Sequence, residues 1–256
     1  MPRRLEGRSA GSALLAAPVL WVGVFFLALL LAMPHAGPVF HWAFPAVEPP
    51  VYDRASFLAL FLSQAGIVAA ASLAASVTGI GLAIFVTRPA GRDFRALVEA
   101  LATVGQTFPP AAVLALAVPA FGFGARPTIA ALYLYGLLPI IGNTVAGLEA
   151  VPAAVRDAAA GMGMSARQVL WRIELPLAAP VILAGVRVSV TIGIGTATIG
   201  STVGALTLGT PIFDGLAVDK MPLVLQGAVL VALFAIVTDM AFARLEAWLR
   251  PPGAAR

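Results

Sequence analysis

Two ionisable residues stand inside otherwise apolar stretches, and their chemistry is the first question raised by the sequence. Arg187 lies nine residues into one stretch, and Asp239 lies six residues before the end of another. At 1.5 Å per residue, they lie about 13 Å and about 9 Å from helix ends expected on the same side of a membrane. Such charges serve ion-coupled transport or form structural pairs. Two hypotheses follow: a structural Arg187–Asp239 ion pair, or a secondary transporter or channel that uses these residues.

The remaining residues offer little chemistry for an enzyme. The chain contains no cysteine, which excludes thiolate nucleophiles and thiolate metal sites. Its single lysine, Lys220, lies in AVDKMP rather than in a phosphate-binding loop, and neither HExxH nor GxSxG occurs. His35 and His41 have no third ligand nearby and fit exposed loop residues better than a metal site. We therefore expect a non-enzymatic chain without a metal, cofactor or bound nucleotide of its own.

The composition indicates the environment of the protein. The 256 residues are 60% hydrophobic and 11% charged, whereas soluble domains carry about 25% charged residues. The net charge is +4, but the basic residues fall in short loops between apolar segments. This placement is typical of membrane orientation and argues against nucleic acid as a partner. The sequence predicts an all-α polytopic membrane protein embedded in a lipid bilayer.

Six segments are long and apolar enough to cross a membrane. They are residues 12–33, 57–87, 96–120, 127–147, 178–203 and 222–245. With the N-terminus in the cytoplasm, twelve of the sixteen basic residues lie on the cytoplasmic side, three lie outside, and Arg187 lies within a helix. The positive-inside rule therefore predicts two cytoplasmic termini in a bacterial inner membrane. The first segment exceeds the roughly 7–15 apolar residues of a secretory signal and is expected to remain as an anchor.

The segments suggest three regions: an anchor with a proline-rich, extended outer loop (1–56), a transmembrane domain (57–247), and a cytoplasmic tail (248–256). Within the fifth segment, small residues recur every four positions, on one helical face. These residues are Gly185, Ser189, Gly193 and Ala197. Small side chains permit close helix packing, so this face is either a packing surface within the chain or a moving or subunit interface.

Residues 148–176 interrupt the apolar pattern with a polar insert. Pro152 suits the first turn of a short helix, and Gly161 and Gly163 permit a sharp turn after it. Ser165 followed by Gln168 is a capping box that starts a second helix. Leu175-Pro176 is expected to close the insert. We predict a helix, a turn and a helix at the cytoplasmic surface, in a form that suits docking to a partner.

The insert resembles the cytoplasmic signature of ABC-transporter import permeases: Glu-Ala-Ala, three residues, Gly, nine residues, Ile-x-Leu-Pro. Here the motif reads Asp157-Ala158-Ala159, then Gly163, then Ile173-Glu174-Leu175-Pro176, with Asp157 where Glu is usual. The resemblance implies a type I importer permease fold, like that of methionine permeases. It also implies that residues 156–176 couple this chain to an ATPase. The implied contact residues are Asp157, Ala158, Ala159, Met162, Gly163, Met164, Ile173, Leu175 and Pro176.

A narrower resemblance concerns the solute. The stretches QTFPPAAVLALAVPAFGFG and PVILAGVRVSVTIGIGTATIG are similar to permeases of glycine betaine, carnitine and choline importers. Such permeases often carry GAGGLG after the fifth helix, where this chain has GALTLG. The resemblance implies cytoplasmic ATPase subunits that bind ATP, a second identical or paralogous permease chain, and an extracytoplasmic solute-binding protein. An amino acid or another small solute is the alternative cargo, and the sequence assigns no solute-binding residue.

Overall fold

The computed structural model describes residues 9–249, so most of the expected tail (248–256) and five of the arginines in the basic count lie outside the described residues. The described chain contains helices and no strand. The long helices are α1 (Ser9–Ala32), α3 (Phe57–Val86), α6 (Ala125–Glu149), α9 (Leu175–Ile199) and α11 (Met221–Leu249). The shorter α-helices are α2 (Gly37–Ala43), α4 (Arg95–Thr107), α5 (Pro110–Phe121), α7 (Ala153–Gly161), α8 (Ala166–Val169) and α10 (Thr210–Ala217).

Five helical stretches in the described part are long and apolar enough to cross a membrane, and they correspond to five of the six predicted segments. The prediction of one continuous helix over 96–120 was wrong, because this segment is divided into α4 and α5. The backbone is extended at Phe108 and Pro109. Consecutive prolines, Pro109 and Pro110, remove two backbone donors, and the residue before a proline is disfavoured in helical geometry.

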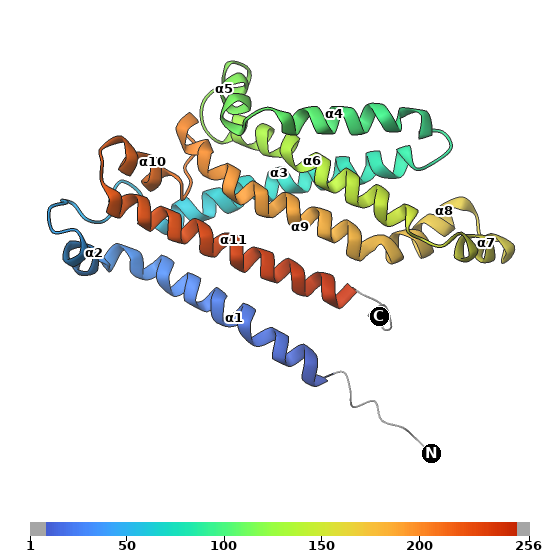
Figure 1. Cartoon of the computed structure of the whole chain (residues 1–256), viewed down its shortest axis with the longest axis horizontal. Helices are drawn as coiled ribbons and strands as arrows, with labels where there is room; N and C mark the ends of the chain where they lie inside the picture. The colour runs from blue at the N-terminus through green and yellow to red at the C-terminus, as the bar shows by residue number, and fades with distance from the viewer. Residues whose placement is uncertain (1–8, 250–256) are drawn as a thin grey trace.

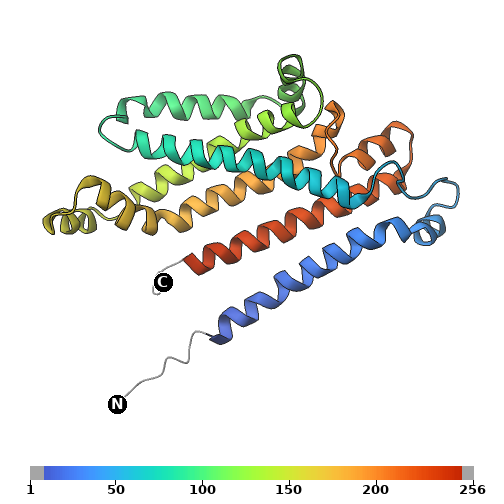
Figure 2. The ribbon, with the colours of Figure 1, turned by 180° about the vertical axis from the view of Figure 1, so that it is seen from behind.

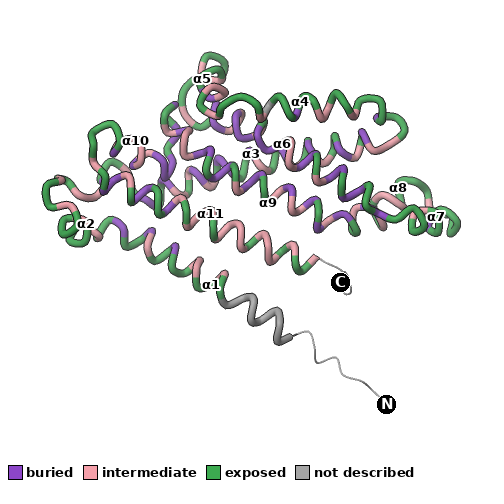
Figure 3. Tube along the Cα trace, viewed as in Figure 1, coloured by how far each residue is buried: buried purple, intermediate pink, exposed green. Residues whose placement is uncertain are grey.

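The three helices α3, α6 and α9 form the centre of the bundle, where most of the buried residues lie (Figure 3). α11 packs against α9, and α1 packs against α11 at the edge, while α4 and α5 cover α6 (Figure 1). The first and last described turns of the chain lie at the same end of the bundle as α7 (Figure 2). We call this the α7 end, and the opposite end, with α2 and α10, the α10 end.

The repeated small residues of α9 face the interior. A Cβ on Gly185 would lie 2.7 Å from the Pro139 carbonyl oxygen and 2.7 Å from the Asn143 Cβ, both on α6. Ser189 and Ala197 are buried, and Gly193 lies against Val68 of α3 and Leu132 of α6. Close packing requires small side chains here. The structure places this face within the chain, at the contacts of α9 with α6 and α3.

Residues 34–56 are partly helical, which differs from the expected extended loop. A 3-10 turn (Met33–His35) and α2 each have a proline in the first turn, where its missing N–H is not needed. The buried Gln226 of α11 then holds the segment: its amide donates to the Pro50 carbonyl at 2.7 Å, and its oxygen accepts from the Tyr52 N–H at 3.1 Å. A buried amide with partners on both sides fixes this irregular backbone on the bundle.

Candidate functional site

The polar insert forms a helical hairpin at the α7 end. α7 begins after Pro152, and α8 begins after Ser165. The predicted capping box is confirmed: the Ser165 hydroxyl accepts from the Gln168 N–H, and the Gln168 side chain accepts from the Ser165 N–H at 2.8 Å. These two bonds satisfy donors that a helix start otherwise leaves free. The second arm of the hairpin therefore starts at a fixed residue.

Gly163 determines how α7 ends. Its φ is +81°, in the left-handed region where a Cβ is penalised. The Gly163 N–H donates to the Ala160 carbonyl at 2.9 Å, and the Met164 N–H donates to the Ala159 carbonyl at 3.2 Å. These two bonds form a Schellman motif with glycine at its left-handed position. The turn between the arms consequently depends on glycine at position 163, whereas Gly161 ends α7 in ordinary helical geometry.

The second arm of the insert continues into the membrane helix. α8, a five-residue π-helical segment (Leu170–Glu174) and α9 follow one another as a single helical stretch. The expectation that Leu175-Pro176 closes the insert was wrong in this respect. Pro176 lies in the first turn of α9, directly after the π-helical segment, whose wider hydrogen-bonding pattern includes a bond from the Leu175 N–H to the Leu170 carbonyl. The turn is therefore connected to α9 without an intervening loop.

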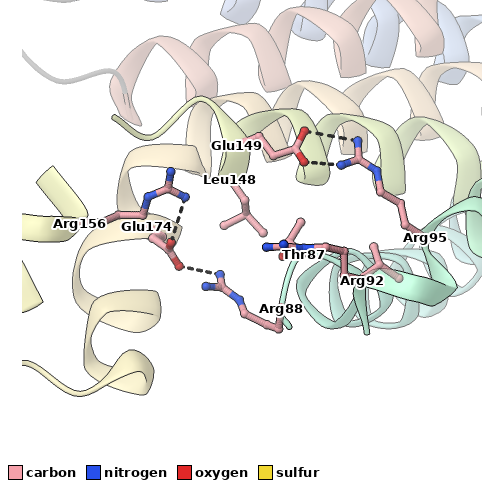
Figure 4. Close-up of a pocket in the computed structure, with 9 residues that line it drawn as sticks. Thr87, Arg88, Arg92, Arg95, Leu148, Glu149, Arg156 and Glu174 are labelled. Atoms are coloured by element: carbon pink, nitrogen blue, oxygen red, sulfur yellow. Dashed lines mark hydrogen bonds and ion pairs between the residues drawn. The ribbon is translucent and has the colours of Figure 1, made fainter. Parts of the chain in front are cut away.

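Glu174 connects the insert to the end of α3. This residue is only 2% exposed. Its carboxylate accepts a hydrogen bond from Arg88, which follows α3, at 2.6 Å, and lies 3.8 Å from the guanidinium of Arg156 on α7. Figure 4 shows the carboxylate between the two arginines. A buried charge requires compensation of this kind. Glu174 thus joins α7, the π-helical segment and the end of α3.

A second ionic contact lies beside the first. Arg95, the first residue of α4, donates to both carboxylate oxygens of Glu149 at the end of α6, and also to Glu99 at 2.9 Å. The hydrogen bonds to Glu149, and then the one to Glu99, raise the pKa of Arg95 above its ordinary value. The residues of both contacts line an open cavity of about 290 Å³. Its charged lining residues are Arg88, Arg92, Arg95, Arg156, Glu149 and Glu174.

The motif residues divide between a buried and an exposed side of the hairpin. Ala159 is fully buried, and Leu175 packs against the cluster formed by Leu148, Ala178 and Ile182. Met164 and Ile173 are half-buried, while Ala158, Gly163 and Pro176 are exposed. Met162 is 75% exposed at the turn. Asp157 is exposed and lines a groove of about 560 Å³ together with Met164, Arg88, Arg92 and Arg156. One side of the hairpin thus packs against the helix bundle, and the other side is exposed.

The structure also brings Arg187 and Asp239 together, far from the hairpin turn in sequence. Arg187 on α9 donates to the two carboxylate oxygens of Asp239 on α11 at 2.6 and 2.7 Å. Glu246, two helical turns after Asp239, lies 3.6 Å from the same guanidinium. A bidentate arginine–carboxylate contact is both strong and directional. It joins α9 to α11, and both side chains are only partly buried.

Sequence reasoning did not identify the contacts among Arg88, Arg95, Glu149 and Glu174. A signal was present, since Glu174 stands between Ile173 and Leu175 at the start of a membrane helix and would need a partner there. Its partner could not be chosen from the sequence, because Arg88 is 86 residues away and several arginines lie on the same side of the chain.

Known proteins share this sequence and this fold. Residues 75–251 match the family described as binding-protein-dependent transport system inner membrane component. The chain is 43% identical over 177 residues to the osmoprotectant import permease protein OsmY of Salmonella typhimurium. This alignment covers 69% of this chain and 75% of that protein. It is 41% identical over 180 residues to the glycine betaine/carnitine/choline transport system permease protein OpuCD of Bacillus subtilis. That alignment covers 70% of this chain and 78% of the Bacillus protein.

Among solved structures, an inward-facing MetNI methionine ABC transporter is similar with a TM-score of 0.69 at 18% identity, over 76% of this chain and 96% of that one. This likeness establishes the type I ABC importer permease fold. The apolar helices and the relatives identify a multi-pass inner-membrane transport subunit. Because the family match covers most of its length, the chain belongs to the binding-protein-dependent transport system inner membrane components.

Proposed function

We propose that this chain is the permease subunit of an ATP-driven importer for a quaternary ammonium osmoprotectant such as glycine betaine, carnitine or choline. The observation that carries the proposal is the hairpin of α7 and α8, which is continuous with α9, is held to the end of α3 through Glu174 and Arg88, and is exposed at its turn. The choice of solute is supported by relatives of 37–43% identity that are named as osmoprotectant, carnitine or choline permeases.

In this proposal the α7 end faces the cytoplasm, in accord with the distribution of basic residues. The turn at Met162 and Gly163 sits in a cleft of a separate ATPase subunit, which binds and hydrolyses ATP. This chain binds no nucleotide or other cofactor. Closure of the ATPase moves α7 as a rigid unit, and the motion reaches α9 through the continuous helix and α3 through Glu174 and Arg88. The pathway then alternates between inward and outward access.

The other partners follow from the same proposal. A second permease chain, identical or paralogous, completes the pathway. An extracytoplasmic binding protein delivers the solute to the α10 end. Quaternary ammonium groups are recognised by aromatic cages, and we assign that cage to the binding protein. The four tryptophans of this chain support the assignment, because Trp21, Trp42, Trp171 and Trp248 are all exposed and lie on different elements.

Reconstitution in vesicles tests the proposal. The chain would be purified from its host with its ATPase and binding protein, and uptake of glycine betaine, carnitine, choline and methionine would be compared. We expect ATP-dependent uptake of at least one quaternary ammonium solute, and ATP hydrolysis that rises when the binding protein is loaded. Methionine uptake without uptake of any quaternary ammonium solute would overturn the solute assignment. Uptake that proceeds without an ATPase would overturn the transport class.

A further inference from the structure

The cavity beside the hairpin carries an excess of positive charge. Among its lining residues are four arginines (Arg88, Arg92, Arg95 and Arg156) and two carboxylates (Glu149 and Glu174). We refer to it as the arginine cavity. We propose that the arginine cavity binds a phosphate group, namely the head group of an anionic phospholipid in the leaflet at the α7 end. The identity of that leaflet rests on the proposed orientation, whereas the binding itself does not.

The internal ion pairs leave the positive charge only partly compensated. Glu174 is shared by Arg88 and Arg156, and Glu149 is occupied by Arg95. Arg92 lines the cavity and forms no ion pair with a residue in the described range 9–249. The Nε atom of Arg88 is buried and has no hydrogen-bond partner among the same residues. Two nearby carboxylates, Glu99 and Asp157, do not line this cavity.

Guanidinium groups from separate elements make a suitable phosphate site. Arginine presents several N–H donors in a planar fork that matches phosphate oxygens, and its charge persists at all physiological pH values. Arg92 and Arg88 come from the turn between α3 and α4, and Arg95 comes from the first turn of α4 (Figure 4). The cavity volume of about 290 Å³ leaves room for a phosphate and part of an attached glycerol unit.

The position of the cavity favours a lipid over a free anion. Its apolar lining residues are Val86, the last residue of α3, and Leu148, near the end of α6. The cavity therefore lies where two membrane-spanning helices end, which is the level of lipid head groups. Basic pockets between such helices at the cytoplasmic side are suited to anionic head groups. A bound head group would contact Arg88 and Arg156, the arginines that also hold Glu174.

Native mass spectrometry of the purified full chain in detergent tests the binding. The probe is phosphatidylglycerol, compared with diacylglycerol of the same acyl chains, which lacks the phosphate. We expect retention of phosphatidylglycerol over diacylglycerol. Arg92→Gln should weaken the retention about five-fold, since each basic residue near an anionic lipid contributes about 1 kcal/mol. Arg92→Glu should weaken it further. Because Arg92 forms no ion pair with described residues, these variants should fold normally, as circular dichroism would verify.

The matched control is Arg167→Gln, which removes an exposed arginine of the hairpin that does not line the cavity and should leave retention unchanged. Equal losses in Arg167→Gln and Arg92→Gln, or none in Arg92→Glu, would overturn the proposal. Competition with inorganic phosphate distinguishes a lipid head group from a free phosphate ion as the occupant of the cavity. Weak displacement of phosphatidylglycerol by inorganic phosphate supports a lipid site. Full displacement at low millimolar concentration supports a site for free phosphate and would overturn the lipid assignment. Displacement of the lipid by the ATPase, with weaker ATPase binding in Arg92→Gln, would assign the cavity to a protein interface and overturn the proposal. Because this test measures lipid binding and not solute uptake, failure of the lipid proposal can be distinguished from failure of the proposed transport function.

Discussion

The two glycines at the end of α7 should respond in opposite directions to the same substitution. A Cβ at either position would meet no atom within 4 Å, so steric overlap does not separate them. Their backbones differ: Gly163 has a φ of +81°, whereas Gly161 is helical. Gly163→Ala should cost about 1–2 kcal/mol because alanine is strained in the left-handed region. Gly161→Ala should stabilise α7 by about 0.5–1 kcal/mol because helical glycine is entropically unfavourable.

The strain acts on the geometry of the hairpin turn. A penalty of 1–2 kcal/mol changes an equilibrium constant by roughly 5–30-fold. If the native turn is what the ATPase recognises, the affinity of the purified ATPase for Gly163→Ala should fall within that range. The Gly161→Ala affinity should equal or exceed that of the unmodified chain. Gly163→Asn provides a graded control, because asparagine tolerates the left-handed region better than alanine.

The assay is a titration of ATPase subunit against the reconstituted permease, with stimulated ATP hydrolysis as the readout. Thermal unfolding of each permease variant would verify that the bundle stays folded. We expect the apparent affinities to rank Gly161→Ala first, then Gly163→Asn, then Gly163→Ala. Gly163→Leu should be at least as impaired as Gly163→Ala and should lose transport while the binding protein still binds solute. Equal affinities for Gly161→Ala and Gly163→Ala would show that the ATPase does not recognise the left-handed turn at position 163.

Three further predictions concern the ionic contacts and the topology. Glu174→Gln should destabilise the hairpin by about 2–3 kcal/mol in thermal unfolding, because it removes one partner of a buried charge-assisted contact. The control, Glu99→Gln, changes an exposed pair and should cost about 0.3–0.5 kcal/mol in the same assay. Similar losses in the two variants would count against the contact of Glu174 with the arginines. Arg187→Ala should reduce stability more than Asp239→Ala, because Asp239→Ala leaves Glu246 near the arginine. The double variant should depart from additivity by about 0.5–3 kcal/mol, and strictly additive losses would argue against the structural pair. Because the chain contains no cysteine, impermeant thiol reagents applied from outside should label His41→Cys and Val218→Cys and spare Arg167→Cys. Positions 41 and 218 are exposed and lie at the α10 end. External labelling at position 167 would reverse the proposed orientation.

The sequence was sufficient to locate most membrane helices and the two arms of the insert. Apolar length defined α3, α6, α9 and α11 to within a few residues, because a bilayer imposes a minimum length on each span. The capping box at Ser165 was readable because it depends on residues three apart. The break at Phe108 was also readable in principle, since the two following prolines disfavour helix, but the overall apolarity of 96–120 obscured it.

Other features depend on distant parts of the chain. The π-helical segment at Leu170–Glu174 accommodates both Pro176 and the buried Glu174, and no local pattern distinguishes it from an α-helix. The pairing of Glu174 with Arg88 depends on where α3 ends relative to the start of α9. The small-residue face of α9 could be recognised from its spacing, but its partner, α6, is visible only in the folded bundle.

The most direct test of the coupling hairpin is cross-linking from its turn. Because the chain has no cysteine, Met162→Cys provides a single reactive thiol at a residue that is 75% exposed. A short reagent that carries one thiol-reactive group and one photoreactive group would be attached to this thiol in the purified complex of permease and ATPase and then illuminated, with Trp42→Cys at the α10 end as the control. We predict a permease–ATPase cross-link for Met162→Cys that changes in yield when ATP is bound, and none for Trp42→Cys. An intact complex in which Met162→Cys never cross-links to the ATPase would show that the hairpin turn does not dock to the ATPase.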